Sequence, residues 1–568
     1  MQALVSLHLT SSRLRPLQRM ALAVCIAATL LLTGCASSLP KEVERPVSAA
    51  LSQPQNTNLG AFIEQNRPAN TKKDASAFTL ISGPQQAFSS RMALVENAQK
   101  TLDLQYYAIH ADHRTSQLLR AIVNAARRGV RVRVLLDDFH STGANAQVMR
   151  LAFVPNVEMR MFNPLAGSRA STIGRAWTIL TDFQRAQQRM HNKLFAADNT
   201  LAVIGGRNLG DAYFDASNDG NFVDLDVLTG GPIVKDLSRS FDRYWNNVRA
   251  YPVQSLISEQ ELLKLKSQFE QEDSKTQTTS TQAQTTDTDQ DDTALNLRQI
   301  PWVWAQAMVL ADSPAKIPTE SDEESFDSQE STLLSSITEP GKTLAAAAPV
   351  LNTESVVNGL LALIRSAKQD LLVVSPYFVP GPEIMSAFRA ARQQGVRIRI
   401  LTNSLASNDA PLAHAGYARH RKELLKLGIT LHEMRSEAAN VRSALRSGST
   451  GASGSTGASR AMLHTKLLVI DGRLVAVGSM NLDMRSQHQN TELALLIASR
   501  TFSQQARDSI DESLPENSWR VEITPNGKLI WRAPQDSGLS DAHSEPDASL
   551  GLRLMLQLIG PLAPDSLL

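Results

Sequence analysis

Two short segments of this 568-residue chain carry the same pattern of chemically active side chains. The pattern is His-x-Lys-x4-Asp, and its copies are His191-Lys193-Asp198 and His464-Lys466-Asp471. Residues i and i+2 of an extended strand share a face, so the histidine and lysine of each copy should point the same way. Two such strands meeting across a pseudo-two-fold axis would bring two imidazoles and two ammonium groups together.

Two neighbouring lysines need an anion between them, and a phosphodiester suits this set of groups. An imidazole can attack phosphorus or protonate a leaving oxygen. Ammonium and amide groups can stabilise charge on the phosphoryl oxygens. Glycine-containing segments after the two motifs supply the amides of Asn208 and Asn481, with Ser479 beside the second. No carboxylate cluster for a metal is evident, so we expect neither a metal nor another cofactor.

An internal repeat indicates the elements that position these motifs. Residues 125–135 (AARRGVRVRVL) recur as residues 390–401 (AARQQGVRIRIL). Each copy follows an amphipathic helix pattern, over 116–128 and 384–394, and then alternates valine or isoleucine with arginine as a strand does. Residues 102–107 and 371–377 are corresponding strands. The order predicts two α/β halves with parallel strand pairs covered by helices.

The duplicated motif resembles the double His-Lys-Asp motif of the phospholipase D superfamily, and the resemblance covers both halves. It implies an α/β fold of two homologous domains, each a mixed β-sheet flanked by helices. The domains would be related by a pseudo-two-fold axis with one active site between them. It further implies a covalent phosphohistidine intermediate, with His191 as nucleophile and His464 as general acid and then base.

The same resemblance implies roles for the remaining motif residues. Lys193 and Lys466 would bind phosphate. Asp198 and Asp471 are expected to orient their motifs rather than to contact phosphate.

Each histidine also requires a carboxylate that holds its tautomer. Asp224 and Glu492 occupy corresponding places, 33 and 28 residues after the histidine of their own half. In the family such groups pair crosswise, which implies Glu492 with His191 and Asp224 with His464. Asp226 is an alternative to Asp224, and both acids could instead be ordinary exposed strand residues.

Three further segments resemble the C-type branch of the bacterial cardiolipin synthases: residues 205–214, 401–409 and 414–419. The resemblance implies a phosphatidyltransferase that makes cardiolipin from phosphatidylglycerol, phosphatidylethanolamine or both. The alternative is a hydrolase with the same site, either a phospholipase D or a nuclease. A third possibility is an inactive, membrane-anchored binding protein. Aromatic residues make up only 5% of the chain, which disfavours base stacking, so no nucleic-acid partner is expected. The oligomeric state is left open.

The N-terminus has the pattern of an export signal. A basic stretch precedes the apolar run 20–32, which ends in Leu32-Thr33-Gly34-Cys35 and resembles the bacterial lipobox. The resemblance implies a lipid on Cys35 that anchors the protein, with Ala36 directing it to the outer membrane, facing the periplasm. Anionic and zwitterionic phospholipids are the expected partners. Cys25 and Cys35 are the only cysteines, which excludes a disulfide framework and a Cys-ligated metal site.

The composition predicts a domain organisation in six parts. They are a signal peptide (1–34), a flexible tether (35–77), a first domain (78–253), an insert with disordered acidic segments (254–350), a second domain (351–500) with a flexible loop (436–459), and a C-terminal extension (501–568). Residues 300–304 are too apolar for a linker and are expected to pack on the body. The leucine-rich stretch 550–558 is either a membrane contact or a packed terminal helix.

Overall fold

The structure is a computed structural model, and it describes residues 39–140, 143–165, 182–217, 220–257, 267, 294–317, 355–436 and 461–560. The predicted signal peptide, Cys35, the acidic segments of the insert and nearly all of the predicted loop 436–459 lie outside these ranges.

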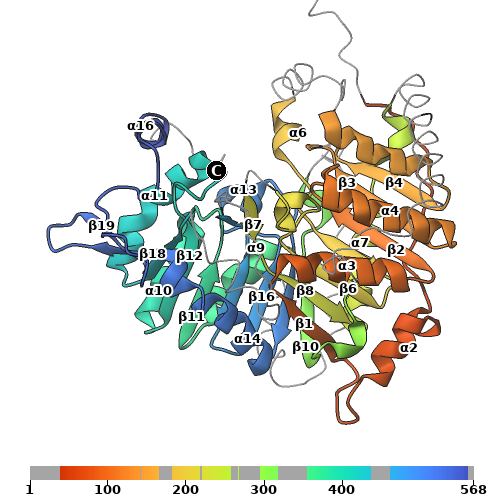
Figure 1. Ribbon diagram of the computed structural model, residues 1–568, viewed down its shortest axis with the longest axis horizontal. Coiled ribbons are helices and arrows are strands. Elements are labelled where there is room, and N and C mark those ends of the chain that lie inside the picture. The colour runs from red at the N-terminus through yellow and green to blue at the C-terminus, as the bar shows by residue number, and fades with distance from the viewer. Residues whose placement is uncertain are drawn as a thin grey trace, which may run out of the picture.

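A single 17-stranded sheet runs through both halves of the molecule (Figure 1). Its central strand is β10 (Val303–Ala311). On one side follow β1 (Ser76–Ile81), β8 (Asp226–Gly230), β6 (Leu201–Gly205), β5 (Leu194–Ala197), β2 (Thr101–Tyr106), β3 (Arg131–Asp137), β4 (Val157–Phe162) and β9 (Ala250–Pro252). On the other side follow β17 (Leu493–Ala498), β16 (Leu474–Gly478), β15 (Leu467–Ile470), β11 (Asp370–Val374), β12 (Arg397–Asn403), β13 (Thr430–Met434), β18 (Ser518–Ile523) and β19 (Leu529–Arg532).

The two halves repeat one strand order. Strands β2, β3 and β4 are parallel, as are β11, β12 and β13, and the other pairs in the sheet are antiparallel. The predicted pair of mixed α/β domains is confirmed, and their sheets are joined. Strand β10 joins them, because it pairs with β17 on one side and with β1 on the other. The pair β10–β17 of the second half corresponds to the pair β1–β8 of the first.

Helices cover the outer faces of both halves. In the first half they are α3 (Pro84–Asn97) and α4 (His113–Arg127), and in the second α9 (Val356–Ser366), α10 (Pro382–Gln393) and α11 (Pro411–Lys426). The predicted repeat helices are confirmed as α4 and α10. Each is followed by a glycine with positive φ, Gly129 at 94° and Gly395 at 83°, a conformation that glycine adopts without a Cβ clash when it ends a helix.

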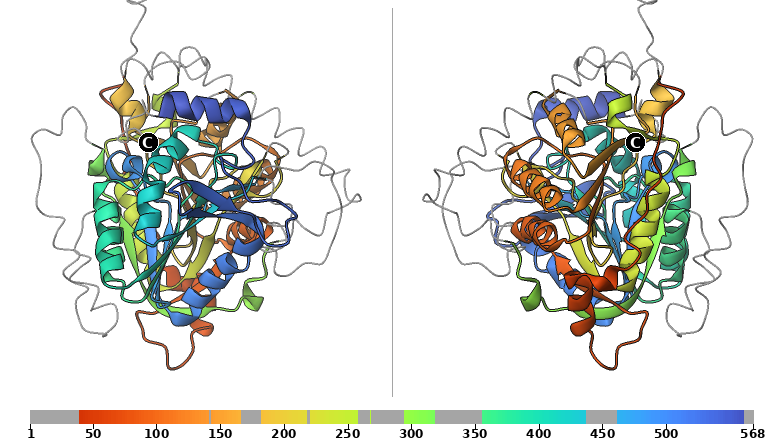
Figure 2. Two further views of the ribbon diagram at one scale, coloured as in Figure 1. Left: turned by 90° about the vertical axis from the view of Figure 1, so that its left-hand side faces the viewer. Right: turned by 90° about the vertical axis from the view of Figure 1, so that its right-hand side faces the viewer.

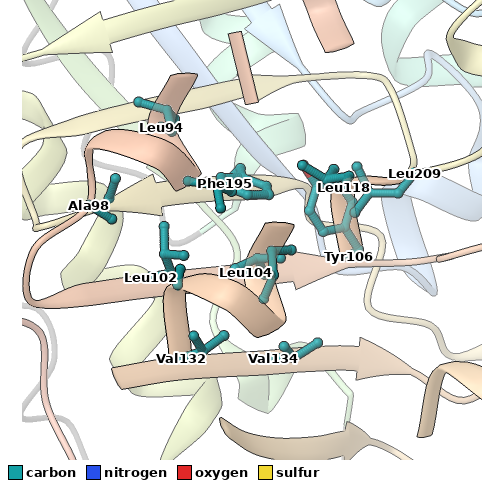
Figure 3. Close-up of a cluster of buried hydrophobic side chains, with 14 of the residues drawn as sticks. Leu94, Ala98, Leu102, Leu104, Tyr106, Leu118, Val132, Val134, Phe195 and Leu209 are labelled. Atoms are coloured by element: carbon teal, nitrogen blue, oxygen red, sulfur yellow. The ribbon is translucent and has the colours of Figure 1, made fainter. Parts of the chain in front are cut away.

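Alternating residues on the strands build the core beneath these helices. Leu102, Leu104 and Tyr106 of β2 point to one face, beside Val132 and Val134 of β3 (Figure 3). Successive side chains of a strand point to opposite faces, so the residues between these on the same strands point to the second face of the sheet. That second face packs in a core shared by both halves, with α7 (Pro232–Trp245) and α14 (Arg500–Asp511).

The described part of the predicted tether is not a free linker. Helix α2 (Asn58–Gln65) buries Leu59 and Ile63 in the first core. Before it, the backbone of Ser48 and Ala50 donates hydrogen bonds to Asn246 and Asp242 at the end of α7. The expectation of a flexible tether was wrong for residues 39–77, because apolar side chains of this segment pack in the core and its backbone N–H groups find acceptors on α7.

The predicted edges of the second domain were also wrong. Residues 303–311, placed in the insert, form β10 and begin the second half as β1 begins the first. At the other end, α14 packs on the shared core and β18 extends the sheet beside β13, as β9 does beside β4. The second half therefore runs past residue 500, and only its last part is an extension.

The other α-helices of the described residues are α6 (Phe183–Gln187), α13 (Met484–His488), α15 (Leu514–Asn517) and α16 (Leu550–Ile559). Among the described residues, no helix combines the length and apolarity needed to cross a membrane.

Candidate active site

Backbone hydrogen bonds between the two halves position the histidines. Strand β14 (Ala461–Leu463) pairs in parallel with β7 (Asn221–Val223), and the His464 N–H then donates to the Val223 carbonyl at 2.8 Å. In the mirrored arrangement, the His191 N–H donates to the Thr491 carbonyl at 2.9 Å. Each histidine is therefore held next to the residue that precedes the carboxylate of the opposite half.

The histidines and carboxylates pair crosswise between the halves. His191 Nδ1 lies 3.0 and 3.1 Å from the two carboxylate oxygens of Glu492. His464 Nδ1 lies 2.7 Å from Asp224 Oδ2. The predicted pairing is confirmed, and the alternative is excluded because Asp226 forms buried ion pairs with Arg91 and Arg207 instead.

This pairing fixes which ring nitrogen can react. An ionised carboxylate only accepts hydrogen bonds, so each Nδ1 carries the proton and each Nε2 keeps its lone pair. Both rings line one cavity of about 1030 Å³ between the halves. The two histidines are otherwise buried, with 8% and 4% of their surface exposed.

The motif lysines lie beside the histidines in the same arrangement. Lys193 Nζ donates to the His191 carbonyl at 2.7 Å, and Lys466 Nζ donates to the His464 carbonyl at 2.6 Å. Burial lowers the pKa of both ammonium groups, that of Lys466 to about 8, although carboxylates of the site oppose the shift. Buried, adjacent cations of this kind are stabilised by an anion.

The two carboxylates differ in pKa. Burial raises the pKa of Asp224 to about 6, because Lys466 and Arg207 offset only part of the desolvation. Burial acts on Glu492 in the same direction, but His191, Lys193 and the Ser479 hydroxyl outweigh it and lower the pKa of Glu492 to about 2. Glu492 is therefore the firmly ionised partner.

Both imidazoles are neutral near pH 7 before an anion binds. Burial lowers the pKa of His191 to about 4, against the attraction of Glu492. Burial and then the charges of Lys466 and Lys193 lower the pKa of His464 well below its usual value. A neutral imidazole with a free Nε2 lone pair is a nucleophile.

The motif aspartates lie away from the cavity. Asp198 accepts hydrogen bonds from the backbone N–H groups of Gln99, Lys100 and Thr101, at 2.7 to 2.9 Å, where β2 begins. Asp471 binds the equivalent residues 368–370 before β11. Their contacts are those of residues that orient the motif, as expected.

Replacing Asp198 with asparagine should destabilise the fold and leave the site intact. The substitution retains one oxygen acceptor but sets an amide N–H group against the Gln99 N–H, which should cost about 1–3 kcal/mol of unfolding free energy. Chemical denaturation measures this loss. Asp536→Asn is the matched control, because Asp536 shares the positive φ but is exposed. A tenfold loss of activity per folded molecule would instead indicate contact with the substrate.

The supporting residues of the prediction also lie at the site. Asn208 and Asn481 line the cavity, and Asn208 donates to the Tyr213 hydroxyl at 2.9 Å. The Ser479 hydroxyl donates to Glu492 Oε2 and so helps to hold the carboxylate in its orientation toward His191. Gly206 packs against Asp224, where an added Cβ would lie 2.5 Å from Oδ2.

Sequence reasoning missed several groups. Tyr107 and Tyr377, which follow β2 and β11, line the cavity, and the Tyr377 hydroxyl donates to Asp409 at 2.8 Å. Asp312, directly after β10, accepts the Glu492 N–H at 2.9 Å and so fixes the backbone of that carboxylate. The tyrosines could have been found from the repeat, which places both after equivalent strands. Asp312 has no comparable signal.

The comparisons with known proteins agree with this architecture. The family model described as "Cardiolipin synthase, PLD-like domain" matches residues 92–245 and 360–514, more than half of the chain. Cardiolipin synthase C of Escherichia coli K12 is 33% identical over 490 residues, covering 85% of this chain and 94% of its own. An uncharacterized protein of Helicobacter pylori J99 is 31% identical over 504 residues, covering 88% and 91%.

A solved structure supports the fold alone. The phosphatidylserine synthase of Haemophilus influenzae Rd KW20 superposes with a TM-score of 0.53 at 12% identity, covering 89% of this chain and 98% of its own. The matched family model, the long relatives and the duplicated His-Lys-Asp site together lead to one conclusion. This chain belongs to the phospholipase D superfamily and, within it, to the cardiolipin synthase-like enzymes.

Proposed function

We propose that this protein makes cardiolipin by transferring a phosphatidyl group to phosphatidylglycerol. The donor is phosphatidylglycerol, phosphatidylethanolamine or both, and the group is carried on His191. The observation that carries the proposal is the crosswise pairing, which leaves two Nε2 atoms from opposite halves on one cavity. The similarity to cardiolipin synthases supports this choice of substrates.

In the first half-reaction, the phosphodiester of the donor binds next to Lys193 and Lys466. His191 Nε2 attacks phosphorus, a P–N bond forms, and the P–O bond to the head-group alcohol breaks. His464 protonates the leaving oxygen. The bound anion offsets the lysine charges that lower the pKa of His464, so substrate binding itself favours the protonated acid.

In the second half-reaction, the phosphatidyl group is transferred to the acceptor. A glycerol hydroxyl of phosphatidylglycerol gives its proton to His464 as its oxygen attacks phosphorus, and the P–N bond to His191 breaks. Glu492 stabilises the Nδ1–H of His191 throughout, because its low pKa keeps it ionised. Water in place of the hydroxyl would give phosphatidic acid, the product of the hydrolytic alternative.

The transferase proposal is tested by product analysis. Purified protein is incubated with vesicles of phosphatidylglycerol, with and without phosphatidylethanolamine, and the lipids are identified by mass spectrometry. Cardiolipin is the expected product. Phosphatidic acid without cardiolipin would contradict the synthase and favour a phospholipase D.

The pH dependence of kcat/KM should be bell-shaped. Asp224, with a pKa of about 6, becomes protonated below that pH and loses the negative charge that stabilises His464 as an imidazolium. Lys466, with a pKa of about 8, loses its positive charge above that pH. Activity should therefore fall on both sides of a maximum near pH 7, since kcat/KM reports the pKa values of the free enzyme. Asp224→Asn should remove the acidic limb, and a wild-type profile that is flat from about pH 5 to 9 would contradict the assignment.

We also propose that the protein is lipidated on Cys35 and held at the outer membrane, facing the periplasm. The basic, apolar and lipobox-like sequence of residues 1–35 supports this. Labelling with a palmitate analogue should mark the wild type and not Cys35→Ser, whereas an unlabelled wild type would overturn it.

A further inference from the structure

We propose that α16 is a membrane-docking helix that holds the mouth of the active-site cavity against a phospholipid bilayer. The inference rests on the proposed function for its choice of partner, a lipid surface. The surface concerned, here called the leucine surface, consists of Leu550, Leu554 and Leu558 of α16 together with Leu412 of α11, the helix on which α16 packs.

Helix α16 is apolar on the side that the protein does not cover. Leu550, Leu554 and Leu558 are spaced four residues apart and are 72%, 49% and 73% exposed. Residues at this spacing lie on one side of a helix. On the opposite side, Leu552 and Leu556 pack against Leu405, Ala406 and Ala548.

Contacts of the preceding segment attach the helix to the second half. The segment before it is bound through Glu545, which forms an ion pair with Arg421 at 2.8 Å and lies 3.4 Å from His414 Nε2. Asp547 accepts a hydrogen bond from the Trp519 indole at 3.1 Å. These contacts give the exposed leucines a defined position on the second half.

The same piece of structure forms part of the cavity wall. Helix α16 packs on α11 and on residues 405 and 406, while Asp409, Leu412 and Ala413 in the same region line the cavity. Leu412 is 44% exposed and also lines the cavity, so it is the member of the leucine surface that lies at the cavity.

Position and charge favour a bilayer over other occupants. In Figure 2, α16 lies along one end of the molecule, at which α6 is also found and the described chain begins. A helix in this orientation can lie in the plane of a membrane interface. Its one charged residue is Arg553, and it carries no acid, which suits an anionic phospholipid surface.

A fluorescent reporter tests the contact directly. In the full chain with Cys25 and Cys35 replaced by serine, Leu554→Cys is labelled with the polarity-sensitive dye NBD. Vesicles of phosphatidylglycerol and phosphatidylethanolamine should raise its emission severalfold, and nitroxides on the acyl chains should quench it. Leu539→Cys is the matched control, because Leu539 is similarly exposed (41%) but lies outside the leucine surface, and its emission should not change.

Unchanged emission at residue 554 would overturn the proposal. The proposal would also be overturned if the emission rose with protein concentration in the absence of vesicles while the molar mass doubled. The leucine surface would then be covered by a second copy of the chain.

Charge variants separate docking from catalysis. The triple variant Leu550→Asp, Leu554→Asp, Leu558→Asp should lose about tenfold or more of the rate on vesicles, since apolar burial drives interfacial binding. Its rate on dispersed short-chain phosphatidylglycerol should equal that of Leu539→Asp. Equal rates of both variants on vesicles would contradict docking. If the wild type acted on neither substrate while residue 554 still inserted, the proposed function would fail and docking would stand.

Discussion

Alanine in place of His191 should lower kcat for phosphatidyl transfer by about 10⁴-fold or more, because the covalent route is lost with the nucleophile. Steady-state assays on vesicles measure the loss. His543→Ala is the control, because His543 lies on the surface outside the cavity and should retain full rate. A His191→Ala enzyme with normal kcat would eliminate the phosphohistidine mechanism.

A better leaving group distinguishes His191 from His464. A phosphatidyl ester of p-nitrophenol releases an anion that needs no protonation, so His464→Ala should recover most of the first half-reaction and release a burst of p-nitrophenol. His191→Ala should release none. The reverse pattern would exchange the two roles, because both rings have equivalent partners and line the same cavity.

Glutamine in place of Glu492 should lower kcat by about 10³–10⁴-fold with little change in KM. The glutamine amide can donate to His191 Nδ1, which favours the tautomer with its proton on Nε2 and removes the attacking lone pair. In the proposed mechanism the lysines bind the substrate, so binding should persist in this variant. Glu512→Gln, an exposed residue of the second half, is the control.

The kinetic pattern shows whether Glu492 acts through His191. Glu492→Asp retains the acceptor and should recover part of kcat, while denaturation midpoints show that each variant is folded. A rise in KM with kcat unchanged would mean that Glu492 supports substrate binding and not the tautomer of His191.

Much of this site was predictable from the sequence because it is duplicated. One His-x-Lys-x4-Asp segment is weak, but two copies that follow two copies of a helix and strand indicate paired half-sites. The crosswise partners Glu492 and Asp224 were predicted because the family resemblance supplied their pairing. The helices that end just before Gly129 and Gly395 were predicted because their signals are local.

The errors concern contacts between residues far apart in the chain. Residues 300–304 read as an apolar stretch in an insert, and local pattern could not show that β10 would pair with both β1 and β17. Residues 39–53 resemble a linker in composition. Composition does not reveal the hydrogen bonds that tie this segment to α7, such as that from the Ala50 N–H to Asp242. Asp312 acts on Glu492 from 180 positions away.

Strand β10 has a consequence for how lipids reach the site. Many enzymes with an active site between two domains admit substrate by swinging the domains apart about a hinge. Here one strand is hydrogen-bonded into both halves, so a swing of that kind would have to break a ladder on one side of β10. We therefore expect lipids to enter and leave the cavity while the two halves keep their positions relative to each other.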